Sequence, residues 1–345
     1  MDHWRRGHKQ ICKKIHRGGN AEQYYADKKY KEAVAVAVEA CRGRHEGQKC
    51  YICLEAVHPH TGEGLVRGCA CGDRDGVSSP ELGVAHVSCL ARQAKILCDE
   101  GEETDLDGEA FDKRWMRWEE CGLCEQRYHG FVWCALGWAC WKTYVGRPET
   151  DWARVNALTV LGNGLWAAER HAERLAIVEV QLATQRRLGI SEYPIIVTRS
   201  NFANCLHSLG RLDEALAMER DVYARCKELL GTTNKSTLHT GNNLAHSLIQ
   251  QGQYAEAKEF AGKLIPQCRR ALGSNHVMTL NCHAAFAEAL YSDAGASRAD
   301  VLEAVTILED VVRARRRVFG NHHPETIRAL AILEGARMKR EDVAA

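Results

Sequence analysis

The sequence predicts a mainly α-helical protein, in which a small irregular segment rich in cysteine precedes a solenoid of stacked helix pairs. Two observations support this fold class. Half of the 16 cysteines of the 345-residue chain lie between residues 50 and 124, in Gly-rich sequence without periodicity. From residue 128 onward, apolar residues return at helical spacing and short phrases recur about every 42 residues. The cysteine-rich segment and the repeats are therefore expected to be separate parts of the chain.

The composition is that of an ordinary soluble protein, with 45% hydrophobic and 26% charged residues. The 46 Lys and Arg nearly balance the 45 Asp and Glu, so no overall field favours nucleic acid or a membrane surface. The longest apolar run spans residues 131–141, whereas a membrane-spanning helix needs about 20 apolar residues. We therefore predict neither a nucleic-acid partner nor a membrane span.

No export signal is visible, because the first 17 residues carry six Lys or Arg and no apolar stretch. We expect the chain in the cytoplasm, with the nucleus as the alternative, where thiols stay reduced and clustered cysteines more often hold metal than form disulfides. Some cysteines stand alone in helical patterns and are expected to be small buried core residues. These are Cys205, Cys226, Cys268 and Cys282.

The opening stretch MDHWRRGHKQICKKIHR places His8 and Cys12 in a basic segment. It resembles the C-terminal end of a MYND finger, a two-zinc protein-interaction module that closes with an acidic residue, Trp and His-x3-Cys, here Asp2, Trp4, His8 and Cys12. The cysteines that precede this end in the family are absent, and two ligands alone do not hold a structural zinc. We expect residues 1–17 to be a MYND remnant with orphaned ligands on a short basic helix, left by a truncated N-terminus or, if Met1 is the true start, kept as a vestige.

Residues 18–48 are a predicted helical connector. Ala, Glu and Lys occur at helical density after a Gly-Gly break. Ala26, Tyr30, Ala33 and Ala37 fall on one face of the resulting helix.

The segment 49–127 contains eight candidate metal ligands in four close pairs. The pairs are Cys50 with Cys53, Cys69 with Cys71, His86 with Cys89, and Cys121 with Cys124. Close pairs suit zinc, because a tight turn can point two ligands at one ion while a distant pair completes the tetrahedron. Four pairs thus imply two Zn²⁺ ions. The segment also needs them, since residues 54–88 hold six glycines and no long apolar run, which leaves little core to offset chain entropy.

The order of four cysteines, one histidine and three cysteines, with a one-residue gap in the second pair, resembles the RING-CH finger of ubiquitin ligases. The resemblance implies a cross-brace, in which the first and third pairs share one zinc while the second and fourth share the other. It also implies a shallow groove for a ubiquitin-conjugating enzyme, lined by Ile52 and by Trp115 or Trp118. The PHD finger shares the ligand order, but its Trp lies two residues before the seventh ligand, whereas Trp118 lies three before Cys121.

The segment departs from the RING-CH pattern in its loops and in its last turn. The gaps of 14 residues after Cys71 and 31 after Cys89 are longer than usual for that family. Glu125 follows the last ligand, where active RING ligases often place a cation, and an anion cannot donate the same hydrogen bonds. The finger is thus better supported than ligase activity. His58 and His60 are expected to be loop residues, because the ligand set is complete without them.

Residues 128–145 are a predicted linking helix, and the repeats run over 146–338, before a tail at 339–345. Leu-Gly pairs recur at a spacing of 42, and between them Ala203 returns as Ala245 and Gly210 as Gly252. Ala lets two helices approach and Gly ends the first of them, so each copy is an antiparallel helix pair that must stack to bury its apolar face. One copy carries five extra residues around DAGASRADVLE, which we place at the turn between its helices.

The repeats resemble the tetratricopeptide repeats of kinesin light chain, in the period near 42 and in the phrases TLHTGNNLAHSLIQQGQYAEA and GNHHPETI. The resemblance weakens in the first copy, where Glu169 and Arg174 replace the expected Gly and Ala. It implies an α-solenoid that binds peptides. No heptad coiled coil lies upstream. We therefore expect the scaffold of that family in this protein, but not a role in kinesin transport.

Aligning the copies places a set of polar residues on the concave wall of the solenoid. Asparagine amides can pair with both the N–H and the C=O of an extended peptide. Any one of these residues is more simply explained as solvated, but the set at equivalent positions favours a peptide groove. Its members are Asn163, Asn204, His207, Asn242, His246 and Glu288.

The sequence therefore predicts an intracellular protein-interaction adaptor: a two-zinc RING-CH-like finger fused to a tetratricopeptide α-solenoid that recruits a protein partner. No phosphate loop, nucleophile elbow or His-Glu-x-x-His motif is present. As a ubiquitin ligase, the finger would act by bringing a charged conjugating enzyme close to a substrate on the solenoid. The alternative is a non-catalytic scaffold in which zinc is purely structural.

Overall fold

The structure of the chain is a computed structural model that describes residues 21–73 and 82–342. The predicted MYND remnant, with His8 and Cys12, lies outside the described residues. The chain divides into two compact units, Met1–Gly72 with Ser78–Ile177 and Asp73–Val77 with Val178–Ala345. We call them the N-terminal unit and the C-terminal unit.

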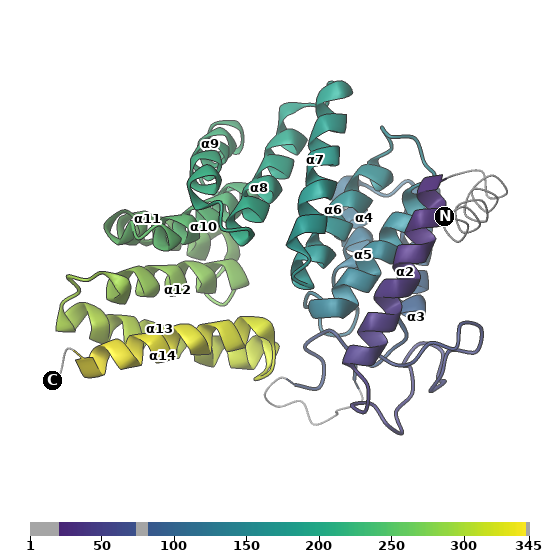
Figure 1. The fold of residues 1–345 in the computed structure, drawn as a ribbon, viewed down its shortest axis with the longest axis horizontal. Coiled ribbons are helices and arrows are strands. Elements are labelled where there is room, and N and C mark those ends of the chain that lie inside the picture. The colour runs from purple at the N-terminus through teal and green to yellow at the C-terminus, as the bar shows by residue number, and fades with distance from the viewer. Residues whose placement is uncertain (1–20, 74–81, 343–345) are drawn as a thin grey trace, which may run out of the picture. The chain divides into compact units, whose positions relative to one another are not determined.

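Helix α5 (Gly130–Tyr144) is the centre of the N-terminal unit (Figure 1). Its sequence GFVWCALGWACWKTY is apolar nearly all round, as expected for a helix buried on every side. Two helices, α2 (Ala21–Ala40) and α6 (Trp152–Ala167), pack against it. α2 buries Ala26, Ala33 and Ala37, which belong to the face that the periodicity indicates.

The stretch between the third and fourth ligand pairs is helical, whereas the sequence predicts irregular structure there. It holds α3 (Val87–Glu103), α4 (Gly108–Trp115) and the 3-10 helix η1 (Met116–Trp118). α3 buries Leu90 and Ala94 at a four-residue spacing. This short apolar stripe is hard to recognise among the Cys, Gly and His residues around it. The long gap after Cys89 is therefore an inserted helical hairpin.

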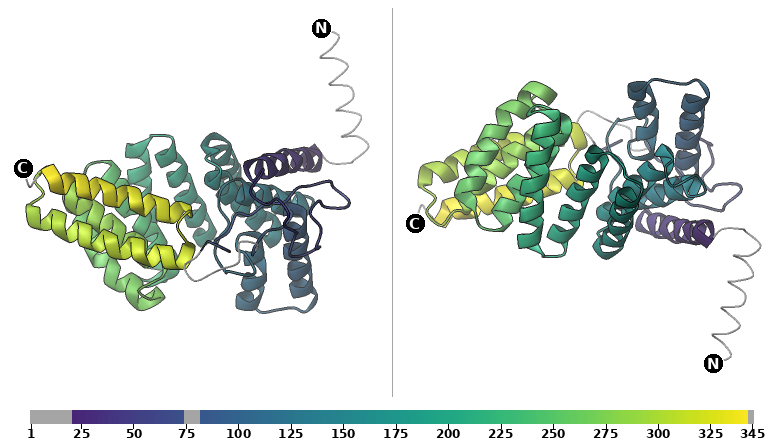
Figure 2. Two further views of the ribbon diagram at one scale, coloured as in Figure 1. Left: turned by 90° about the horizontal axis from the view of Figure 1, so that it is seen from below. Right: turned by 90° about the horizontal axis from the view of Figure 1, so that it is seen from above.

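The C-terminal unit is a solenoid of antiparallel helix pairs (Figure 2). Its helices, in chain order, are α8 (Glu192–Ser208), α9 (Leu212–Leu230), α10 (Lys235–Gln250), α11 (Tyr254–Leu272), α12 (Val277–Ser292), α13 (Arg298–Phe319) and α14 (Pro324–Asp342). α7 (His171–Arg187) contains the boundary between the units. Consecutive helices of the solenoid pack on each other, and α8, α10, α12 and α14 also pack in a row. The first helices of successive pairs thus form one continuous wall, and the predicted fold class is confirmed.

The first helix of a pair ends in a left-handed turn. Gly210 after α8 and Gly252 after α10 have φ of 76° and 70°, a conformation that glycine adopts without steric cost. Glu169 after α6 has φ of 59° in the equivalent turn. Its amide donates to the carbonyl three residues back, as that of Gly210 does. The first copy therefore keeps the shape of the turn without its glycine.

The insertion in the copy after Gly273 lies at the turn between α12 and α13, as the sequence predicts. There Ser297 and Asp300 form a reciprocal capping box at the start of α13. Across the described ranges, 21–73 and 82–342, no helix is both long and apolar enough to cross a membrane.

Candidate metal centre

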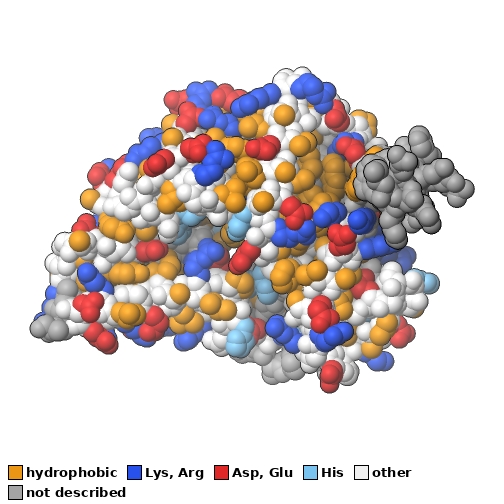
Figure 3. All heavy atoms as spheres, viewed as in Figure 1, with side chains coloured by type: hydrophobic (Ala, Val, Ile, Leu, Met, Phe, Trp, Pro, Cys, Tyr) orange, Lys and Arg blue, Asp and Glu red, His pale blue; other side chains and the backbone are white. Residues whose placement is uncertain are grey.

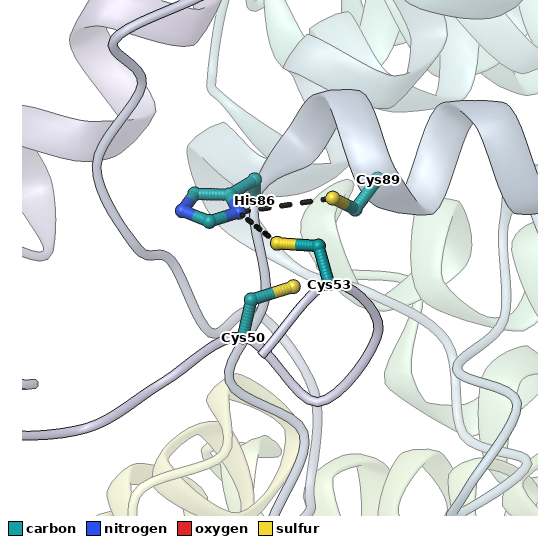
Figure 4. A group of neighbouring side chains, drawn as sticks. All are labelled: Cys50, Cys53, His86 and Cys89. Atoms are coloured by element: carbon teal, nitrogen blue, oxygen red, sulfur yellow. Dashed lines mark hydrogen bonds between the residues drawn. The ribbon is translucent and has the colours of Figure 1, made fainter. Parts of the chain in front are cut away.

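The first and third ligand pairs come together as one group (Figure 4). Cys50 and Cys53 lie on a tight turn, in which the amide of Leu54 donates to the carbonyl of Cys50 over 2.9 Å. His86 precedes α3 and Cys89 lies in its first turn. The four ligand atoms lie within 4.8 Å of one another. His86 Nδ1 is 3.4 Å from Cys53 Sγ and 3.7 Å from Cys89 Sγ.

The second and fourth pairs form a second group, Cys69, Cys71, Cys121 and Cys124, whose sulfurs also lie within 4.8 Å of one another. All four are buried. The turn at Cys121 repeats the turn at Cys50, because in each the residue four positions on donates its amide to the cysteine carbonyl. The amide two positions on lies 3.4 Å from the cysteine sulfur in both turns. Such N–H groups stabilise a thiolate.

The electrostatics of these groups suit a cation. Neighbouring thiols donate hydrogen bonds that lower the pKa of Cys121, and the bond from Cys124 has the largest effect. The hydrogen bond to Cys121 is the chief cause that raises the pKa of Cys69. Four thiols this close therefore cannot all ionise without a compensating positive charge. In the first group, burial lowers the pKa of His86, which favours the neutral imidazole that binds metal.

The donor sets fit zinc. One group offers three sulfurs and one imidazole nitrogen, the other four sulfurs, and both are common tetrahedral zinc sets. Thiolate-rich sets disfavour magnesium and calcium, which take oxygen ligands. The residues can thus hold the two ions that the spacing implies.

His58 and His60 stand outside both groups. The ring of His58 packs edge-on against His86, with ring centroids 5.3 Å apart. Its Nδ1 accepts from the Thr61 hydroxyl over 3.0 Å. His58 therefore packs beside the candidate ligand.

The expected contacts for a conjugating enzyme are only partly accessible. Trp115 and Trp118 are 6% and 0% exposed, because the inserted hairpin packs both against α5, where Tyr144 contacts their rings. Little of either tryptophan ring is therefore accessible to a partner, and their role as contacts stays a prediction. Ile52 is half-buried. Leu54 and Leu123, on the turns of the first and fourth pairs, are 67% and 48% exposed.

Two of the predicted groove residues are engaged elsewhere. Asn163 belongs to the N-terminal unit, where its amide donates to Glu119 Oε2 over 2.9 Å. Asn242 is 6% exposed, and its Oδ1 accepts from the thiol of Cys282 at 3.8 Å. These bonds compete with binding of a peptide by either amide, and the groove role of both residues stays a prediction. Repeat alignment places Cα positions, but it does not show which way a buried amide points.

The other groove candidates lie on the row of first helices. Asn204 and His207 on α8, His246 on α10 and Glu288 on α12 are all half-buried. Burial lowers the pKa of His246 to about 4, and the nearby charge of Arg328 acts in the same direction. Burial also raises the pKa of Glu288, which Arg328 opposes. Figure 3 shows a hollow beside α10, where His and Lys or Arg side chains gather.

Arg328 on α14 lies close enough to His246 and Glu288 for its charge to act on the pKa of both, and the sequence prediction did not include it. It stands eight residues after Gly320, as His239 stands eight after Gly231. Counting from these glycines would have aligned the two positions, but the last copy matches the others only partially. α14 therefore extends the wall of first helices with a cation.

Comparisons with known proteins address the solenoid. A family model described as tetratricopeptide repeat matches residues 195–234, 237–277 and 296–325. No curated protein matches the chain.

Among experimental structures, a putative kinesin light chain with nearly identical TPR-like repeats from Podosopora anserina is 21% identical with a TM-score of 0.43, covering 57% of this chain and 90% of that chain. BtubC (BKLC) from P. vanneervenii is 13% identical with a TM-score of 0.39, covering 75% of this chain and 91% of that chain. A Rap protein complexed with Competence and Sporulation Factor is 14% identical with a TM-score of 0.39, covering 74% and 72%. The solenoid is thus made of tetratricopeptide helix pairs over the matched segments.

Proposed function

We propose that this protein is a zinc-binding protein-interaction adaptor, whose finger holds two Zn²⁺ ions and whose solenoid holds a protein or peptide partner. The observation that carries the zinc proposal is the convergence of eight Cys and His side chains into two groups, each with its ligand atoms within 4.8 Å. Zinc in such groups stabilises a finger that has little apolar core of its own.

Metal analysis of the purified chain tests the zinc proposal. We expect two zinc ions per chain for the wild type. Cys53→Ser, in the first group, and Cys71→Ser, in the second, should each remove one ion. Cys205→Ser is the matched control, because Cys205 is a buried thiol of the C-terminal unit outside both groups. A wild-type content below two ions would contradict the proposal.

The partner proposal rests on the repeats and on the half-buried polar residues of their first helices. Asn204, His246 and Glu288 come from three successive first helices, so an extended peptide along the wall would meet each in turn. Amide and imidazole groups can pair with peptide N–H and C=O groups. Peptide binding is thus the activity that this surface supports best.

A peptide-library selection against the intact chain tests the groove. We expect selected peptides to bind Asn204→Ala and His246→Ala at least about tenfold more weakly, since each loses a polar contact worth about 1.5 kcal/mol. Lys263→Ala is the control, because Lys263 lies on α11, a second helix, and its side chain is 70% exposed. Peptides that bind all three variants like the wild type would remove the groove from the proposal.

Ubiquitin ligase activity is a second candidate function. Its support is the exposed apolar surface of Leu54 and Leu123, at 67% and 48% exposure, beside the half-buried Ile52. The burial of Trp118 favours the alternative, a non-catalytic scaffold with structural zinc. An autoubiquitination assay with a panel of conjugating enzymes separates them. Activity that is lost in Cys50→Ser and in Ile52→Ala supports the ligase, and silence with every enzyme supports the scaffold.

A further inference from the structure

Helix α3 starts at a residue that cannot cap it. His86 occupies the N-cap position, with φ of −85° and ψ of 144°, and its side chain makes no capping hydrogen bond. The reason is geometric, because Nδ1 of the imidazole faces the sulfurs of Cys53 and Cys89. The first N–H groups of a helix have no partner within the helix and need one from elsewhere. A ligand at this position therefore leaves the start of α3 in need of a cap.

Glu63 provides that cap from another part of the chain. Its two carboxylate oxygens lie 3.2 and 3.3 Å from the amide nitrogen of Ser88, the second residue of α3. The N–H of this position is one that N-cap side chains ordinarily satisfy. A negative charge at a helix N-terminus is also favourable electrostatically. Glu63 is only 8% exposed, so its carboxylate is held in place.

The loop that carries Glu63 is itself tied to the first metal group. The carbonyl of Glu63 accepts from the amide of His58 over 2.9 Å, and the amide of Gly62 donates to the carbonyl of His58 over 2.9 Å. The His58 ring packs against His86, with centroids 5.3 Å apart. One loop between the first two cysteine pairs thus contacts both the ligand histidine and the helix that follows it.

We infer that Glu63 is a positioning residue for the first metal group: it caps α3 in place of His86 and so frees the imidazole to face the cysteines. The inference rests on the zinc-binding function proposed above. His86 and Cys89 both depend on the first turn of α3, whereas Cys69, Cys71, Cys121 and Cys124 do not lie on it. The loss of the carboxylate should therefore weaken the first site and spare the second.

Cobalt(II) titration of the full chain tests this inference. Its visible spectrum distinguishes a site of three thiolates and one imidazole from a site of four thiolates, so each variant contains an internal reference. Glu63→Met keeps the side-chain length but removes the acceptor, and we expect a loss of about 10–100-fold in affinity at the mixed site alone. Glu63→Gln keeps one acceptor oxygen and should retain part of the affinity. Glu55→Met is the control, because Glu55 is an exposed carboxylate of the same loop.

Each other outcome overturns the inference in a recognisable way. Wild-type affinity at both sites of Glu63→Met would show that the cap is dispensable and would leave the zinc proposal intact. An equal loss at both sites, with a reduced helical signal by circular dichroism, would show that Glu63 supports folding in general. Failure of the wild type to take up cobalt would contradict the proposed metal function, and the inference with it.

Discussion

Glu219 on α9 shows how a single buried carboxyl group changes the pH dependence of stability. The residue is 3% exposed, and burial raises its pKa to about 7. The unfolded chain releases this proton near its ordinary pKa of 4.5. The buried, protonated carboxyl therefore gives its full contribution to the stability of the folded state below pH 4.5. This stabilisation, roughly 3 kcal/mol in all, is lost as the pH rises through about 7.

We predict that Glu219→Gln gains stability relative to the wild type when the pH is raised from 5 to 8. Urea unfolding of both proteins at the two pH values measures the difference. Glu228→Gln on the same helix, whose carboxylate is exposed and pairs with Arg225, should not show the change. An equal difference at pH 5 and pH 8 would mean that Glu219 ionises normally in the folded protein.

Residue spacing made the four ligand pairs predictable, because zinc ligands come in local pairs. Which pairs meet was implied only by the resemblance to the RING-CH finger. Spacing could not reveal the cap supplied by Glu63, which joins the loop after Cys53 to a helix 25 residues away. Nor could it show that Asn163 is bound by Glu119. Such pairs depend on tertiary packing, which single-sequence periodicity does not describe.

Among the elements, α5 and α6 lie close together at Gly164. A Cβ atom there would lie 2.7 Å from the carbonyl oxygen of Trp133 and 2.9 Å from the Cα of Cys134, both backbone atoms of α5. At Gly162, two residues earlier on the same helix, a Cβ atom would meet nothing within 4 Å. The two glycines thus differ in environment while sharing a helix.

We predict opposite effects of adding one methyl group at these positions. Gly164→Ala should force α5 and α6 apart and lower the free energy of unfolding of the N-terminal unit by about 1–3 kcal/mol. Gly162→Ala should raise it by about 0.5–1 kcal/mol, because alanine loses less backbone entropy in a helix. Thermal unfolding of both variants gives the two signs. Destabilisation by both would indicate that Gly162 also packs against a neighbour.

Elements with long periodic patterns were predictable, and short ones were not. α2 and the helix pairs of the solenoid follow from apolar spacing over many residues and from recurrence at 42. α4 is eight residues long, and its Trp115 is buried because Tyr144 of α5 and Trp152 of α6 pack against its ring. The same local sequence would suit an exposed hairpin.

For the whole molecule, both metal groups belong to the N-terminal unit. Structural zinc contributes about 10–16 kcal/mol apparent, whereas a domain is stable by about 5–15 kcal/mol. We therefore predict that a strong chelator unfolds the N-terminal unit and leaves the C-terminal solenoid folded. Limited proteolysis after chelation should release a resistant fragment that begins near residue 178. Loss of all helical signal together, or of none, would contradict this prediction.

The packing of Trp118 under Tyr144 has a practical consequence for dissection of the molecule. A fragment cut to the span of the ligands, residues 49–127, would leave both tryptophan rings of the hairpin without the α5 surface that covers them. Such a piece should be poorly soluble whatever its metal content. Residues 21–177, which retain α2, α5 and α6, are the better choice for spectroscopy of the isolated finger.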